Sequence, residues 1–179
     1  TLDGVNVADA GGGGHWLLPS IQWMDVIEVG GLGANAEYGG YTGGMINGVT
    51  KSGGNKLSGD VELYYQPSSW VADNTPETPD DTFKFSNVAV NVGGPFIKDK
   101  LWFFVSGQYY KEESSNGGPI RTEESPRLFG KLSFQANEQN NIEGWIEWDR
   151  YDIVGRGADS VTPLEATVTE DAPEYVGNL

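Results

Sequence analysis

LSGDVELYYQ, at residues 57–66, alternates between two kinds of side chain along its whole length. Apolar or small residues and Tyr65 occupy the odd positions, and polar residues and Tyr64 occupy the even positions. Side chains two residues apart lie on the same face of a β-strand, so this pattern predicts a strand with one apolar face and one polar face.

The same alternation recurs four times further along the chain, at 83–93, 101–112, 128–136 and 142–149. We therefore predict five strands. Polar side chains predicted to share one face are Asp60, Glu62, Asn87, Asn91, Gln108, Lys131, Gln135, Glu143 and Glu147. Apolar side chains predicted to share the opposite face include Val88, Val90, Val92, Leu128 and Leu132.

The connections between these strands alternate in length. Residues 96–100 and 137–141 are short and polar, as in tight hairpin turns, whereas 67–82, 113–125 and the stretch after 153 are long. An up-and-down antiparallel sheet places alternate connections at opposite ends, so the short turns fall at one end and the long loops at the other. Outer-membrane barrels have this asymmetry. The alternation alone also fits a soluble β-sandwich that acts as a surface or periplasmic binding module.

Residues 1–55 have a different character. An Asp3-Gly4 pair predicts a hairpin within 2–7, the segment 24–29 predicts a short strand, and glycine is dense over 30–54. We expect two units, one at 1–55 and one at 56–179.

Three motifs in this order carry a family resemblance: Asp-Val-Ile-Glu-Val at 25–29, Ala-Glu-Tyr-Gly at 36–39, and TGGMINGVTKSGGN at 42–55. They resemble the closing segment of the plug domain of TonB-dependent outer-membrane receptors, most of all the Oar-like branch, whose members often carry a carboxypeptidase-regulatory-like domain. GGPFIKDKLWFF at 93–104 is similar to the first periplasmic hairpin of that branch.

The resemblance implies an all-β fold with small α content in the plug. It makes residues 1–55 the end of the plug, and 56–179 the first five or so strands of an antiparallel transmembrane barrel of about 22 strands. It also implies energy-coupled transport of a ligand across the bacterial outer membrane, with no enzymatic activity. The implied partners are outer-membrane lipid, the TonB–ExbB–ExbD complex, which engages a segment outside this excerpt, and a small-molecule, peptide or glycan ligand whose binding residues are unknown.

One departure from the family pattern changes the expected mechanism. Related plugs carry two arginines that pair with barrel glutamates, and this chain has Val26 and Gly31 at the corresponding positions. Those ion pairs cannot form here.

The composition bears on other functions. A net charge of −15 opposes nonspecific nucleic-acid binding, and the absence of cysteine excludes thiolate metal sites and cysteine nucleophiles. We predict no catalytic, cofactor or metal residues: His15 is the sole histidine and is expected in a solvated loop.

Glu143, Glu147 and Asp149 on one strand face are the enzymatic alternative, but residues four apart on a strand are roughly 13 Å apart, too far for a glycosidase carboxylate pair. Acidic residues that could instead bind calcium fall in two groups: Asp73, Glu77, Asp80 and Asp81, and Asp149, Asp152 and Asp159.

Overall fold

The computed structural model of the chain describes residues 1–7, 20–31, 44–72, 83–115, 118–157, 163 and 168–178. These residues form two antiparallel sheets and two short 3-10 helices, Ile21–Trp23 and Ser68–Trp70. The smaller sheet pairs β1 (Met24–Gly30) with β2 (Met45–Thr50). The larger sheet contains, in sequence order, β3 (Ser58–Gln66), β4 (Phe83–Ile97), β5 (Leu101–Ser114), β6 (Arg121–Asn137), β7 (Asn140–Arg156) and β8 (Val168–Asn178). None of the helices in the described part of the chain could span a membrane.

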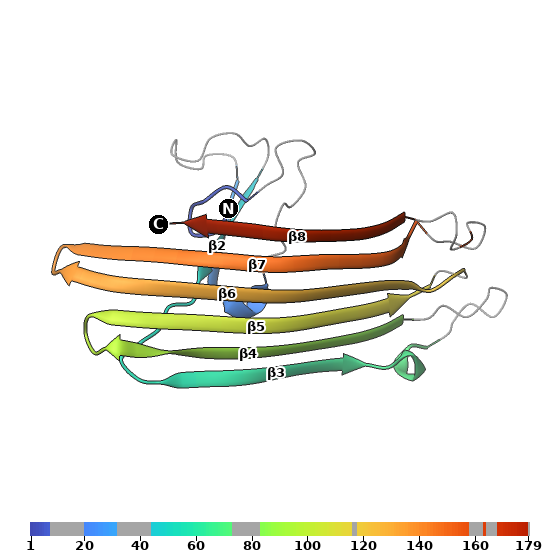
Figure 1. Ribbon diagram of the computed structural model, residues 1–179, viewed down its shortest axis with the longest axis horizontal. Coiled ribbons are helices and arrows are strands. Elements are labelled where there is room, and N and C mark those ends of the chain that lie inside the picture. The colour runs from blue at the N-terminus through green and yellow to red at the C-terminus, as the bar shows by residue number, and fades with distance from the viewer. Residues whose placement is uncertain are drawn as a thin grey trace.

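Neighbouring strands of the larger sheet are also neighbours in sequence, so the sheet is a simple up-and-down meander (Figure 1). The two short turns, β4–β5 and β6–β7, lie at one end, and the longer connections lie at the other. In the β4–β5 turn Asp99 adopts a φ of 59°, which Asp and Asn tolerate better than most residues. The predicted all-β class and the alternation of short and long connections are confirmed.

The larger sheet is longer than predicted in two places. The predicted loop at 113–125 is wrong, because β5 runs to Ser114 and β6 begins at Arg121. Five ion pairs join charged residues in this region and make the polar segment compatible with a ladder: Lys84–Glu113, Lys111–Glu113, Lys111–Glu124, Arg121–Glu112 and Arg121–Glu123.

The stretch after residue 153 was also predicted to be a long connection. Instead, β7 continues to Arg156, and β8 adds a sixth strand that pairs along β7. Pro173 lies within β8 opposite Arg150 of β7 and has no backbone N–H to donate.

The smaller sheet belongs to a unit made by residues 1–7, 20–31 and 44–50, called here the N-terminal unit, which lies on one side of the larger sheet (Figure 1). We call the sheet face that it contacts the inner face and the opposite face the outer face. The predicted hairpin at 2–7 is confirmed as a tight turn: Leu2 and Val5 exchange backbone hydrogen bonds, and Asp3 and Gly4 have positive φ. The linker 51–57 joins this unit to β3.

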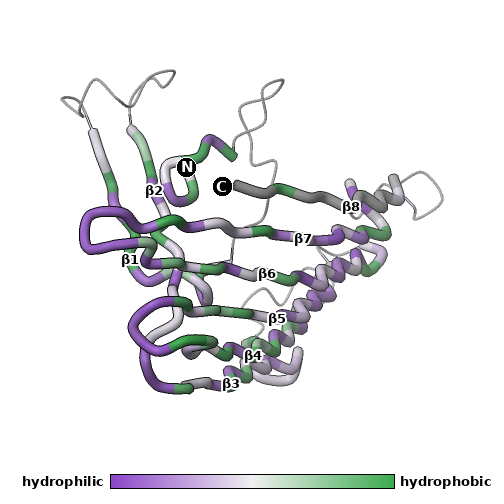
Figure 2. The backbone as a smooth tube through the Cα atoms, turned by 60° about the vertical axis from the view of Figure 1, so that its left-hand side comes forward, coloured by the Kyte–Doolittle hydropathy of each residue, from purple (hydrophilic) through white to green (hydrophobic). Residues whose placement is uncertain are grey.

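The outer face is apolar and remains exposed. Val88, Val90 and Val92 expose 39–45% of their surface, and Leu128 and Leu132 expose 51–53%. Hydropathy alternates along the strands (Figure 2). Across the described residues no second sheet covers this face, because the smaller sheet lies on the other side.

The inner face is polar and largely buried. Buried polar side chains on it include Asn87, Asn91, Ser106, Gln108, Lys131, Ser133, Glu147 and Asp149. The strand register places Asp60, Glu62, Gln135 and Glu143 on the same face. A soluble sandwich buries apolar side chains between its sheets and exposes polar ones, whereas this sheet does the reverse.

Candidate functional site

The contact between the N-terminal unit and the inner face is the best-defined candidate site. Three buried aromatic side chains lie on the inner face, at Phe104, Phe129 and Trp145, and each is at most 5% exposed. They come from β5, β6 and β7, and the register brings them together because Phe129 pairs with Ser106 while Lys131 pairs with both Phe104 and Trp145.

Trp23 of the N-terminal unit packs into this aromatic group. Its ring stacks on Phe129 with centroids 5.2 Å apart, and Phe129 lies 6.2 Å from Phe104 and 6.0 Å from Trp145. Leu2 and Val7 complete the buried cluster. Stacked rings contribute dispersion and burial over a wide area, so this cluster fixes where the N-terminal unit sits on the sheet.

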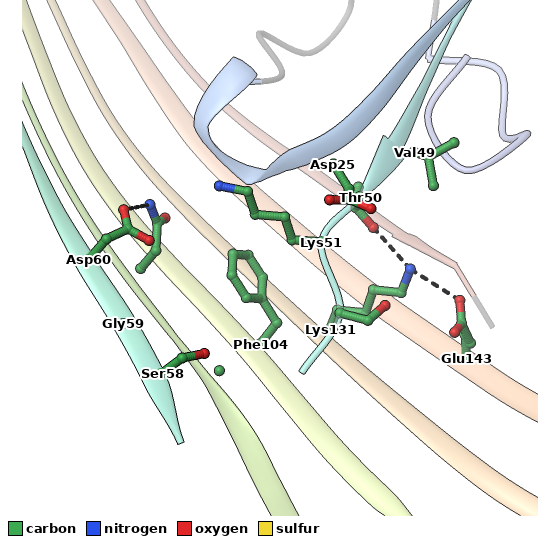
Figure 3. A pocket seen from close by; sticks show the side chains of 13 residues that line it. Asp25, Val49, Thr50, Lys51, Ser58, Gly59, Asp60, Phe104, Lys131 and Glu143 are labelled. Carbon is green, nitrogen blue, oxygen red and sulfur yellow. Dashed lines mark hydrogen bonds and ion pairs between the residues drawn. The ribbon is translucent and has the colours of Figure 1, made fainter. Parts of the chain in front are cut away.

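A buried ionic group lies beside the rings. Lys131 of β6 is 3% exposed, and its Nζ lies 3.3 Å from an Asp3 carboxylate oxygen of the N-terminal unit and 3.0 Å from Glu143 of β7. Lys131 also donates to the Thr50 hydroxyl at 3.1 Å (Figure 3). We call these four residues the Lys131 cluster.

The Asp3 carboxylate is held from its own side as well. The Thr50 backbone N–H donates to Oδ1 at 2.8 Å, and the Thr50 hydroxyl donates to Oδ2. The Asp3 backbone N–H donates to the Gly48 carbonyl at 2.8 Å, which joins the tight turn to β2. Asp3 has a positive φ, and its carboxylate contacts Thr50 at the end of β2.

The linker makes a second attachment to the sheet, at the β4–β5 turn. The Asn55 side-chain oxygen accepts from the Asp99 backbone N–H and from the Trp102 indole N–H, both at 2.8 Å, and its amide donates to the Asp99 carboxylate. Next to it, Gly53 passes so close to the sheet that a Cβ there would lie 2.1 Å from the Phe103 carbonyl oxygen.

A cavity of about 520 Å³ lies between the N-terminal unit and the inner face (Figure 3). Charged and polar residues from both sides line it, including Asp25, Lys51, Asp60, Asn91, Lys131 and Glu143. Asn91 donates to Asp60 at 2.7 Å and accepts from Ser106 at 2.6 Å. Such a lining suits water and polar solutes.

Beyond the apolar rows, the end of the sheet with long connections carries the ion pairs described above. The Lys111 ammonium and the Tyr109 hydroxyl both donate to Glu124, and these bonds hold the pKa of the Glu124 carboxyl below its ordinary value. The same bond to Glu124 raises the pKa of Lys111. These groups are exposed enough for water to weaken each pair, so they guide strand pairing more than they stabilise it.

The acidic alternatives find little support. Glu143 is paired with Lys131, while Glu147 and Asp149 are fully buried and so closed to a substrate. Across the residues whose structure is described, no group of acidic or histidine side chains could hold a metal. His15, the group Asp73, Glu77, Asp80 and Asp81, and Asp159 lie outside those residues.

Sequence reasoning placed Lys131 and Glu143 on the inner face but missed their partners Asp3 and Thr50, as well as Trp23. The available signal was the set of rings at 104, 129 and 145, which lie among polar residues on this face. Aligning the strands in register would have grouped these rings and pointed to a docking surface.

Comparison with known proteins agrees with this geometry. A family model described as an outer membrane beta barrel domain matches residues 49–137. The chain is 30% identical over 111 residues to the TonB-dependent transporter Oar of Myxococcus xanthus, covering 58% of this chain and 10% of that protein. It is 31% identical over 146 residues to the probable TonB-dependent siderophore receptor PirA of Acinetobacter baumannii, covering 75% of this chain and 18% of that protein.

No solved structure gives a significant match. The chain spans less than a fifth of the length of either curated relative.

Proposed function

This chain belongs to the TonB-dependent family of outer-membrane receptors and transporters, and from that premise we propose that it forms the end of a plug and the first wall strands of a transport barrel. In this proposal residues 1–55, which include the N-terminal unit, are the plug segment, and residues 56–179 belong to the wall. The wall continues in chain outside this sequence until about 22 strands close the barrel.

The single observation that carries this proposal is the inverted sheet. Its outer face is apolar and exposed, with Val90 45% exposed, while its inner face buries polar side chains such as Asn91 and Lys131. Apolar residues facing outward and polar residues facing a lumen are what a lipid-embedded barrel requires. The N-terminal unit fills the inner side, where a barrel this wide needs an obstruction to prevent leakage.

Transport then requires the plug to move, and we propose that the energy comes from the TonB–ExbB–ExbD complex. The names of the two curated relatives, a TonB-dependent transporter and a probable TonB-dependent siderophore receptor, support this energy source. The ligand is a solute taken up through the lumen, of the small-molecule, peptide or glycan class.

Depletion of solutes from the growth medium tests the proposal even though the ligand is unidentified. Cells carrying the full-length protein and cells lacking it are grown in medium supplemented with a peptide hydrolysate and a set of ferric siderophores. Mass spectrometry then follows the loss of each compound, with and without a protonophore. We expect at least one compound to be depleted only when both the protein and the proton gradient are present. Depletion that depends on the protein but persists with the protonophore would indicate a passive pore and overturn energy coupling.

A further inference from the structure

We propose that the Lys131 cluster is the separable part of the plug attachment, built so that when it opens Lys131 keeps an ion pair and Asp3 keeps its hydrogen bonds. The inference rests on the proposed function, because it assumes that the N-terminal unit leaves the inner face during transport. It goes further by assigning the attachment to particular residues and by predicting whether each substitution speeds or slows hydrogen exchange in the plug.

The contact between plug and wall in this cluster is one ion pair and one hydrogen bond. Lys131 lies 3.3 Å from Asp3 and 3.1 Å from the Thr50 hydroxyl, and both partners belong to the N-terminal unit. Lys131 is 3% exposed, so the pair is screened little by water. A buried lysine that loses its partner is costly, and that cost ordinarily makes such a pair hard to open.

Each charge, however, has a second partner on its own side of the interface. On the wall, Lys131 lies 3.0 Å from Glu143, which also accepts from Asn141 at 3.0 Å and from Ser133 at 3.3 Å. These neighbours hold the Glu143 carboxylate in place whether or not the plug is present. In the plug, Asp3 accepts from the backbone and the hydroxyl of Thr50.

Separation therefore breaks the Lys131 contacts with Asp3 and Thr50 while leaving Lys131 with Glu143 and Asp3 with Thr50. Glu143 has two effects that favour release: it repels the Asp3 carboxylate, and it stabilises Lys131 after the plug has gone. The stacked rings of Trp23 and Phe129 position the plug on the wall, while the ionic cluster gives an attachment that can open and close.

The polarity of this pair is the reverse of the arginine pattern that the chain lacks at Val26 and Gly31. Here the cation belongs to the wall and the carboxylate to the plug. Positions 26 and 31 therefore do not mark the attachment in this chain, and Lys131 replaces them from the other side of the interface.

Hydrogen exchange of the full-length protein in detergent tests the inference, with the backbone amides of β2 (Met45–Thr50) as the reporter of plug attachment. Lys131→Met should speed their exchange by about tenfold or more, because Asp3 loses its wall partner. In Lys131→Arg the exchange rate of these amides should remain closer to that of the unsubstituted protein, because the positive charge is kept. Glu143→Gln should slow exchange, which is opposite in sign to Lys131→Met. Unchanged or faster exchange in Glu143→Gln would overturn the inference.

A double-mutant cycle supplies the second arm. Asp3→Asn removes the charge while keeping a residue that tolerates the positive φ of this position. Combined with Lys131→Met, it should speed exchange much less than the product of the two single effects, since both remove the same pair. If the double variant speeds exchange by the full product of the two single effects, the two residues are not coupled, and the inference is overturned.

Lys84→Met is the matched control. Lys84 is also a strand lysine in an ion pair, with Glu113 at 3.4 Å, but it lies at the far end of β4 and touches no residue of the N-terminal unit among the contacts of the described chain. Exchange of β2 should be unchanged in this variant. Heat-modifiable migration on gels should show an assembled barrel in every variant. None of these measurements involves a ligand or TonB, so passive transport would refute only the energy coupling, while uncoupled residues would refute only this attachment.

Discussion

Val90 illustrates what the outer face demands of a single residue. It pairs with Val61 on β3 and with Gly107 on β5, and it lies in the middle of an apolar row with Val88 and Val92. In a soluble protein such an exposed apolar row would promote association with other molecules. In a bilayer it is matched to the hydrocarbon that surrounds it.

Val90→Lys should therefore destabilise the full-length barrel by about 2–4 kcal/mol, the cost of a lysine near the membrane midplane. The measurement is the urea or guanidinium midpoint in lipid vesicles, together with heat-modifiable migration. Val90→Leu keeps the apolar contact and should have little effect. Gln139→Lys adds the same charge in the exposed β6–β7 turn and should also be neutral. Equal stability of Val90→Lys and Val90→Leu would show that this face does not contact lipid.

Alternation alone predicted which side chains share a face, so Val90 and Asn91 could be assigned to opposite faces from the sequence. The partners of Lys131 could not, because Asp3 lies 128 positions away and is brought close only by the docking of two separate units. The periodicity of a single strand carries no information about a contact between residues so far apart in sequence.

At the scale of elements, the two strands on either side of the predicted loop at 113–125 share one property. Their missing ends are rich in charge, as at Glu113, Glu123 and Glu124, and glutamate is depleted in strands when each segment is considered alone. In the sheet the charges lie near Lys111 and Arg121, and ion pairs form between them. The ends of β5 and β6 therefore depend on the pairing partner, which a single segment cannot reveal.

The linker offers a sharper test at this scale, because two adjacent glycines lie in opposite environments. A Cβ at Gly53 would meet the Phe103 and Gly94 carbonyl oxygens at 2.1 and 2.9 Å, whereas a Cβ at Gly54 would have nothing within 4 Å. Both replacements reduce the freedom of the unfolded chain similarly.

Gly53→Ala should displace the linker from the sheet and weaken the Asn55 contacts with Asp99 and Trp102, while Gly54→Ala should not. Fluorescence of Trp102 can be separated from that of the other tryptophans by comparison with a Trp102→Phe background. Hydrogen exchange of the Asp99 amide, which donates to Asn55, gives an independent measurement. Similar exchange in both alanine variants would mean that the linker does not lie against the sheet in solution.

At the scale of the whole molecule, the arrangement of connections sets an orientation in the membrane. Short turns face the periplasm in outer-membrane barrels, and long connections face outward. We therefore expect the β6–β7 turn to face the periplasm, and the segment after β3, which contains Ser68–Trp70, to lie outside the cell.

Cysteine labelling checks this orientation, because the 179 residues contain no cysteine. In the full-length protein freed of any other cysteine, Ser69→Cys should react with a membrane-impermeant maleimide on intact cells. Gln139→Cys should react only after the outer membrane has been permeabilised. The reverse pattern would invert the assigned topology and with it the direction in which the plug faces.

The linker also limits how far the plug can travel. Thr50 ends β2 and Ser58 begins β3, and the seven residues between them can span at most roughly 25–30 Å when fully stretched. Even with the aromatic stack and the Lys131 cluster both broken, the trailing end of the plug stays tethered within this radius of the first wall strand. Under the proposed function, we therefore expect a pull from the periplasm to displace the leading end of the plug further than its trailing end, which stays tethered and can return to its position on the wall.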